Sequence, residues 1–404
     1  MNKTWLILAP VILLSACVSK QVITINATPA LAAVADVAED LLLDVGITVF
    51  DPNVPEDVVE QNEMQLVAGV RNAEARYMPY VLRDTLQDTG HWGAVRVVPR
   101  GSETVDLIVT ARLMTSDGER LSLVARAYDS TGRVWLDDEK YADVAGKLNY
   151  REDLTTSRQD PFQDLYNQIA NDLLEFREAM SPKDLSRVRQ VSQIKFAADL
   201  SPEAFGDYLV ENNGRTALQR LPALDDPMLL RAEKIRERDY VFIDTLDQHY
   251  GSFHNQVRPA YNDWRRFNYE EVVRLRYLER EIRRRTITGA ALIVGGLAVS
   301  ANSDDPYTEY GGLVATVGGI YSIYNGIKLR PKLLVHAETM RELGDSFELE
   351  VRPAVLEVEG KTITLSGSVD SQFEQWRELL REIYVTETGL PDVKAADKPD
   401  LPGG

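Results

Sequence analysis

The sequence is poor in the residues on which disulfide, metal and nucleophilic chemistry depends. It has one cysteine, Cys17, and four histidines among its 404 residues. A single cysteine excludes a disulfide within the chain, and the HExxH, GxSxG and P-loop motifs do not occur. His249 and His254 are five residues apart rather than the four of a helical metal pair, so we expect them to be solvated or locally bonded. The sequence therefore predicts no metal, no cofactor and no catalytic residue, although its many carboxylates leave an acidic catalytic pair open.

The sequence also has fewer basic than acidic residues. The chain has 45 Lys and Arg against 63 Asp and Glu, which gives a formal net charge of -18. Nucleic-acid binding needs a clustered basic surface, so the balance argues against a nucleic-acid partner. The contents of 44% hydrophobic and 27% charged residues are typical of a folded chain, and 404 residues suffice for two or three domains.

The beginning of the chain has the form of an export signal. Lys3 precedes the apolar run 5–14, which is too short for a stable membrane span, and the small residues Ser15 and Ala16 lead to Cys17. Leu14-Ser15-Ala16-Cys17 resembles the bacterial lipobox. The resemblance implies cleavage before Cys17, acyl chains on its sulfur and its freed amine, and hence a membrane anchor. The alternative is an ordinary signal peptide that contains a cysteine.

The residues after Cys17 bear on the membrane to which the chain is anchored. Val18 and Ser19 follow it, where lipoproteins retained at the inner membrane commonly carry aspartate. The resemblance therefore implies a lipid-anchored outer-membrane protein that faces the periplasm. Anchoring in the inner membrane is the less favoured alternative.

Composition and periodicity divide the chain into consecutive parts and predict a multidomain α+β fold. The predicted parts are a signal peptide (1–16), a lipidated tether (17–44), an α/β periplasmic module (45–178), a helical region (181–285), a glycine-rich apolar helical hairpin (286–328), a small α+β segment (331–390) and a flexible tail (391–404).

The α/β module is predicted from alternating strand and helix patterns. Strands are expected at 46–50, 95–99, 107–111, 121–125 and 133–135, a hairpin turn at 116–118, and helices at 64–88 and 161–178. This order, with a hairpin that ends in Asp129-Ser130-Thr131-Gly132-Arg133-Val134-Trp135, loosely resembles the TolB amino-terminal domain and curli-secretion-type lipoproteins. The resemblance implies an interaction module of envelope machinery and carries function no further.

The region 181–285 is predicted to be mostly helical. Ser181 followed by Pro182 is a helix start, and Pro222 and Pro227 are expected to break the middle. One long helix is predicted from Pro259 onward. Its apolar stripe is Trp264, Phe267, Leu275, Leu278 and Ile282, and its charged face, with Glu270 paired to Arg274, is expected to be solvated.

Glycines spaced by seven residues are the most informative internal pattern. Seven residues are close to two helical turns, so each series falls on one helix face, where it lets two backbones approach closely. We therefore predict an antiparallel hairpin with the acidic turn 302–306 at its tip, which either enters a membrane or packs within the protein or between copies. The residues are Gly289 and Gly296 in one stripe, Gly312, Gly319 and Gly326 in the other, and Arg283, Arg284, Arg285, Lys328 and Arg330 at the base.

The last structured part of the chain, 331–390, is predicted to contain both strands and helix. Strands are expected at 347–351, 355–358 and 362–369, and a helix from Ser371. The sequence Ile-Thr-Leu-Ser-Gly-Ser-Val at 363–369, followed by this helix, resembles envelope BON domains. We expect a non-enzymatic component of a cell-envelope assembly, transport or secretion machine, with the membrane and envelope proteins as partners and possible homo-oligomers. The alternatives are an envelope enzyme acting on peptidoglycan or polysaccharide, and an oligomeric pore built from the glycine hairpins.

Overall fold

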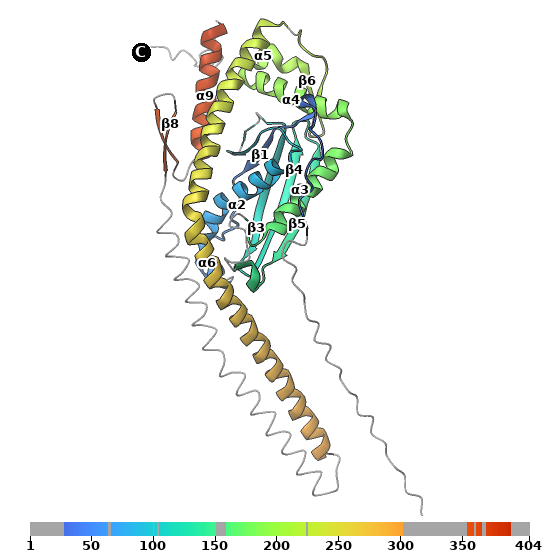
Figure 1. The fold of residues 1–404 in the computed structure, drawn as a ribbon, viewed down its shortest axis with the longest axis vertical. Coiled ribbons are helices and arrows are strands. Elements are labelled where there is room, and N and C mark those ends of the chain that lie inside the picture. The colour runs from blue at the N-terminus through green and yellow to red at the C-terminus, as the bar shows by residue number, and fades with distance from the viewer. Residues whose placement is uncertain are drawn as a thin grey trace, which may run out of the picture.

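The computed structural model describes residues 28–63, 66–99, 101–102, 105–150, 159–223, 225–301, 354–358, 361–365 and 369–388. The described helices and strands form an α+β fold, as predicted (Figure 1). The lipobox with Cys17, the tip of the predicted hairpin, Gly312, Gly319, Gly326, Lys328, Arg330 and the tail lie outside the described residues.

A five-stranded mixed sheet with the order β2-β1-β3-β4-β5 forms the centre of the α/β domain. β1 pairs in parallel with β2 and β3, while β3, β4 and β5 form an antiparallel meander. Helix α2 makes the crossover that the parallel pair β1 and β2 requires. The bounds are β1 (Val45–Thr48), α2 (Ala68–Thr89), β2 (Val95–Val98), β3 (Leu107–Ser116), β4 (Arg120–Asp129), β5 (Val134–Val144) and α3 (Gln163–Glu178).

The two faces of the sheet contribute to two different cores, because side chains alternate along each strand. Leu107 and Val109 lie in the core that α2 and α3 cover. Ile108, between them, packs in a second core with α4 (Pro182–Leu200), α6 (Pro227–Ala301) and α9 (Val369–Thr388). The sheet is therefore buried on both faces over the first part of β3, whereas Arg112 and Met114 further along the strand are exposed.

The predicted elements of this domain are confirmed with changed bounds. The turn at 116–118 is present, and β3 and β4 extend to it from both sides. β5 is much longer than the predicted 133–135, because its pairing with β4 continues as far as Arg120 and Val144. Shorter elements are η1 (Glu39–Leu41), α1 (Val58–Glu63), η2 (Lys147–Tyr150), α5 (Pro202–Phe205) and η3 (Gly206–Tyr208).

The segment before β1 is attached to the domain from Thr28 onward. The backbone amides of Thr28 and Leu31 donate to the side chains of Asp164 and Asn171 on α3, at 3.2 and 2.9 Å. The side-chain amide of Asn167 donates back to the carbonyl of Thr28. The chain therefore follows the domain surface here instead of extending freely.

The long helix differs most from its prediction. Helix α6 runs without interruption for 75 residues, from Pro227 to Ala301, and contains Pro259 in its interior. The predicted break at Pro222 and Pro227 is present, because residues 219–223 and 225–226 are not helical, whereas the predicted start of the long helix at Pro259 is wrong. Pro227 is the first helical residue, a position that suits proline. The hydrogen bond lost at Pro259 is offset by burial of Val257 and Tyr261 beside it.

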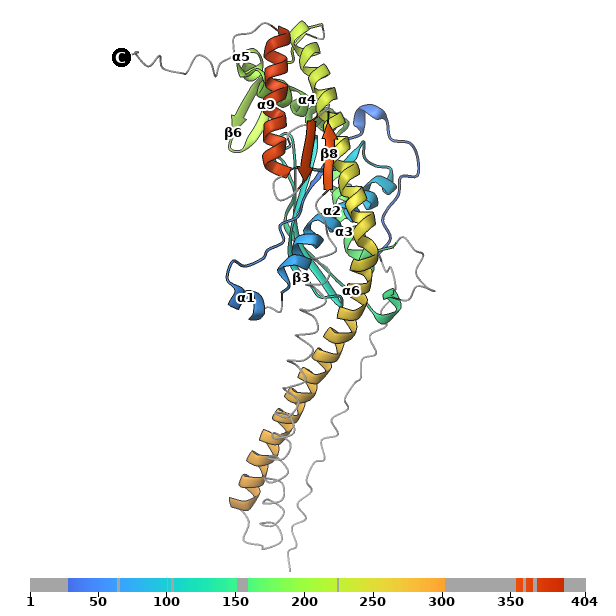
Figure 2. The same ribbon diagram turned by 90° about the vertical axis from the view of Figure 1, so that its left-hand side faces the viewer.

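The first part of α6 packs in the second core with the C-terminal helix (Figure 2). Phe242 stacks on Trp376 of α9 with ring centroids 4.6 Å apart, and the Trp376 indole donates to Asp239. Arg377 pairs with both Asp239 and Asp199. α9 and the hairpin β8 (Ala354–Val358) and β9 (Lys361–Leu365) thus lie against the main body of the protein.

A short hairpin interrupts the region predicted to be helical. β6 (Leu209–Asn212) and β7 (Arg215–Leu218) are joined by Asn213 and Gly214, which both have positive φ, at 53° and 73°. Asn-Gly with both residues at positive φ is the preferred two-residue hairpin turn. The dipeptide was therefore a signal that the helical prediction missed.

The substitution Gly118→Ala tests how closely α6 approaches the β3–β4 turn. Gly118 has φ +80°, and a Cβ there would lie 2.7 Å from the Arg265 carbonyl oxygen and 2.9 Å from the Tyr269 amide nitrogen of α6. We expect Gly118→Ala to lower the free energy of unfolding by about 2–4 kcal/mol, through backbone strain and displacement of the helix. Urea denaturation followed by tryptophan fluorescence measures this.

Gly101→Ala is the matched control. Gly101 has the same φ of +80°, and a Cβ there would meet no described atom within 4 Å. It should cost only the strain of the left-handed backbone, about 1–2 kcal/mol. Equal losses in the two variants would contradict the close approach of α6 to the turn.

Candidate functional site

The longest helix is the element around which a functional site is built. Helix α6 crosses the whole α/β domain and then projects beyond it (Figures 1 and 2). At 1.5 Å per residue, its 75 residues span roughly 110 Å. The polar contacts that hold it to the domain come from the sheet edge, from α2, from the start of α3 and from the β3–β4 turn.

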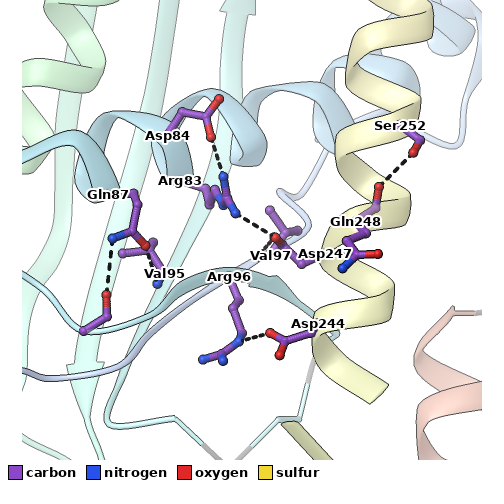
Figure 3. A network of polar contacts seen from close by, with 11 residues as sticks. Arg83, Asp84, Gln87, Val95, Arg96, Val97, Asp244, Asp247, Gln248 and Ser252 are labelled. Atoms are coloured by element: carbon purple, nitrogen blue, oxygen red, sulfur yellow. Dashed lines mark hydrogen bonds and ion pairs between the residues drawn. The ribbon is translucent and has the colours of Figure 1, made fainter. Parts of the chain in front are cut away.

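At the sheet edge, α6 takes the place of a further strand (Figure 3). β2 is an edge strand, and an unpaired edge amide needs a partner. The Asp247 carboxylate accepts from the Val97 amide at 2.8 Å and from Arg83 of α2 at 3.0 Å. Arg96 of β2 pairs with Asp244, one helical turn away, at 2.5 Å. Burial raises the pKa of Asp247, and the Val97 amide and the arginines oppose that shift.

The middle of α6 is held by a buried ion pair. Arg265 is 1% exposed, and its guanidinium donates to both carboxylate oxygens of Asp160 at 2.8 and 3.1 Å. Asp160 also accepts from the Phe162 amide, at the approach to α3. The guanidinium carbon lies 4.2 Å from the ring centroid of Tyr261, a cation–π contact. Two charges taken out of water in this way stabilise the fold only while they remain paired.

A buried carboxylate joins α2, β3 and α6. The Oε1 atom of Glu74 accepts hydrogen bonds from Ser116 of β3 and from Tyr261 of α6, each at 2.6 Å. Arg71, one turn earlier on α2, lies 3.5 Å from the other oxygen. Burial raises the pKa of Glu74, against the opposing effect of Arg71. These contacts fix the spacing of the two helices over the sheet.

The β3–β4 turn receives the next part of α6. Arg276 pairs with Asp117 at 2.5 Å and also with Glu119, and the Asn268 side chain donates to the Asp117 carbonyl. The expectation that this charged face is solvated is therefore wrong at Arg276. Arg274 pairs with Glu271 at 3.3 Å, rather than with the predicted Glu270.

The predicted apolar stripe of this helix is confirmed in part. Trp264 and Leu275 are buried against the domain, and Leu278 and Ile282 are half-buried. Phe267 is exposed. The prediction missed two buried hydrophobic residues of this segment, Tyr261 and Val272, of which Val272 lines the same hollow as Leu275 beside β3.

A polar cavity of about 660 Å³ lies between α2, α3 and α6, with Pro29 and Ala30 at its rim. His254 lines it and is only 8% exposed, so of the two expected roles, solvated or locally bonded, the structure gives this histidine the second. Its ring stacks on Tyr77 with centroids 4.2 Å apart. Burial lowers the pKa of His254, and a hydrogen bond with the Tyr77 backbone opposes that shift. The structure does not describe the side chain of His249.

Beyond Arg276, the helix leaves the domain as a distal arm, which we define as residues 277–301. Tyr277 and Ile287 are exposed in it, and Glu281 pairs with Arg284 and Arg285 at 3.0 and 2.6 Å. Gly289 and Gly296 lie in its backbone, whereas the partner stripe lies outside the description. The packing of two glycine stripes, with the base at Arg283, Arg284, Arg285, Lys328 and Arg330, therefore stays a prediction.

Two absences concern the residues that the structure describes. No helix among them is both long and apolar enough to cross a membrane. No cluster of three or more His, Cys, Asp or Glu side chains in the same part of the chain is arranged to hold a metal ion.

No protein-family model, curated protein or solved structure matches this chain. The resemblances to the lipobox, to the TolB and curli-secretion-type modules and to BON domains therefore stay predictions.

Arg265→Met tests the buried ion pair. Removing the cation leaves the carboxylate of Asp160 buried without its charge partner, so we expect a loss of about 3–5 kcal/mol in the free energy of unfolding. The double variant Arg265→Met, Asp160→Leu should recover much of that loss, because neither charge is then buried. Urea denaturation of the full chain gives both values.

Arg266→Met is the control on the next residue of the same helix. Arg266 is more exposed and pairs with the exposed Asp263 at 2.8 Å, a surface pair worth about 0–1 kcal/mol. A loss for Arg265→Met as small as that for Arg266→Met would show that the buried pair does not hold the helix.

Proposed function

We propose that this chain is a lipid-anchored envelope protein that acts as a non-enzymatic structural component of an assembly, transport or secretion machine. In this proposal the α/β domain holds α6 in a fixed direction, and the distal arm presents an interaction surface at a distance from the domain. The single observation that supports it is the anchoring of α6 along the domain together with its continuation beyond Arg276.

The physical argument concerns stiffness and exposed apolar surface. An isolated helix is marginally stable, and a helix gains most of its stability from tertiary packing. The contacts of Asp247, Arg265 and Arg276 fix the helix over about 30 residues, so the direction of the arm is set by the domain. The arm then carries Ile287, 63% exposed, and the glycine-rich sequence 288–301. Such a surface favours a partner that covers it.

The anchor limits where the domain lies. Ten residues separate Cys17 from Thr28, the first residue bonded to α3. At the greatest extension of roughly 3.3–3.6 Å per residue, they reach about 35 Å. In the proposal, acyl chains on Cys17 therefore keep the α/β domain close to the membrane surface, facing the periplasm.

The anchor is tested by Cys17→Ala, with and without deletion of 286–327. We expect Cys17→Ala alone to lose incorporation of radioactive palmitate and to be released from membranes by carbonate, because the acyl chains supply the attachment. Ser19→Ala, two residues later, should behave as wild type. Retention of Cys17→Ala until 286–327 is also removed would instead make that region a second membrane element.

The arm is tested by placing a photo-crosslinking amino acid at Ile287 in living cells. We expect discrete adducts with an envelope protein at Ile287 and none at Val241. Val241 is 65% exposed on the same helix but lies beside the domain, so it is the matched control.

Each other outcome of the crosslinking experiment has a meaning. Adducts of equal yield at both positions would contradict an interface on the arm. A ladder of adducts between copies of the chain would favour the oligomeric pore, and lipid adducts would favour insertion into a membrane. A hydrolytic or transfer activity of the purified protein would contradict a non-enzymatic role.

A further inference from the structure

The cavity between α2, α3 and α6 has the size and position of a small-molecule site. Its volume of about 660 Å³ falls within the range of about 300–1,000 Å³ that ligand sites occupy. It is lined by one face of α2, which carries Tyr77, Val81 and Asp84, and by one face of α6, which carries His254 and Arg265. These helices are fixed by the buried pair Arg265–Asp160, so the walls are preformed.

Side-chain amides are the most numerous polar groups of the lining. Five side-chain amides face the cavity, and each carries an acceptor oxygen and a donor nitrogen. A hydroxyl group of a ligand has the same dual character. Gln163 donates to Asn167, and the Asn262 oxygen accepts from Arg265. Among the described residues, Asn255 therefore keeps both its donor and its acceptor for a ligand. The five amides are Gln159, Gln163, Asn167, Asn255 and Asn262.

The charges around the cavity nearly balance. Three carboxylates, those of Asp84, Asp88 and Asp160, stand against the guanidiniums of Arg258 and Arg265. Asp160 and Arg265 neutralise each other, and Asp84 pairs with Arg83 at 2.7 Å. An anionic ligand would meet the carboxylates and a cationic one the guanidiniums. The balance favours a ligand without net charge.

We propose that this cavity binds a neutral glycan, a short oligosaccharide whose hydroxyl groups bond to side-chain amides of the lining, Asn255 above all. The hydrocarbon edge of Val81 offers contact to the C–H faces of a sugar ring. This site lies within the domain and does not involve the distal arm. The binding experiment therefore tests it independently of the proposed function.

The experiment is calorimetric titration of the full-length lipidated protein in a detergent without a sugar headgroup. The probes are chitotriose and maltotriose as neutral glycans, inorganic phosphate as an anion and spermidine as a cation. We expect saturable binding of at least one neutral trisaccharide and none of the two ions. Absence of binding by both trisaccharides at millimolar concentration, or saturable binding of an ion alone, would overturn the proposal.

Neighbouring residues of α6 provide a matched pair of variants. Asn255 and Gln256 are both exposed, but only Asn255 lines the cavity. Loss of one hydrogen bond to the ligand predicts binding about three- to tenfold weaker in Asn255→Ala. Gln256→Ala should bind as wild type. Equal effects of the two substitutions would place the glycan elsewhere and overturn the proposal.

Discussion

The burial of Arg265 against Asp160 is the interaction on which the placement of the long helix depends. A slip of α6 by one helical turn, about 5.4 Å, would leave both charges buried without a partner, at a cost of several kcal/mol. Apolar contacts alone would tolerate such a slip better, because one aliphatic side chain can replace another of similar volume. The ion pair therefore gives the helix one register on the domain.

That register fits the other contacts along α6. Asp247 meets the edge amide of Val97 only when the helix lies at this height, and Arg276 then reaches the β3–β4 turn. Gly118 leaves the space in which the turn approaches the helix backbone. The residues that make these contacts are far apart in the sequence. Helix α6 also contributes side chains to both hydrophobic cores.

One helix thus carries two features with separate roles in the proposals. The segment with His254 and Arg265 forms a wall of the polar cavity, and residues 277–301 form the arm. Arg265 lines the cavity and also forms the buried ion pair with Asp160 that fixes the helix. A molecule bound in the domain and a partner bound on the arm would therefore share one continuous helix.

Local signals in the sequence determined most of the α/β domain. Alternating apolar residues predicted the strands, and Ser181 followed by Pro182 predicted the start of α4, where Ser181 accepts from the Asp184 amide at 3.2 Å. Asn213-Gly214 was an equally local signal that was missed. Tertiary structure alone decided the partners of Arg265 and Arg276, which lie 105 and 159 residues away, and it carried the helix through Pro259. The physical reason is that capping and alternation act within a few residues, whereas the choice of an ion-pair partner depends on which distant surfaces the fold brings together.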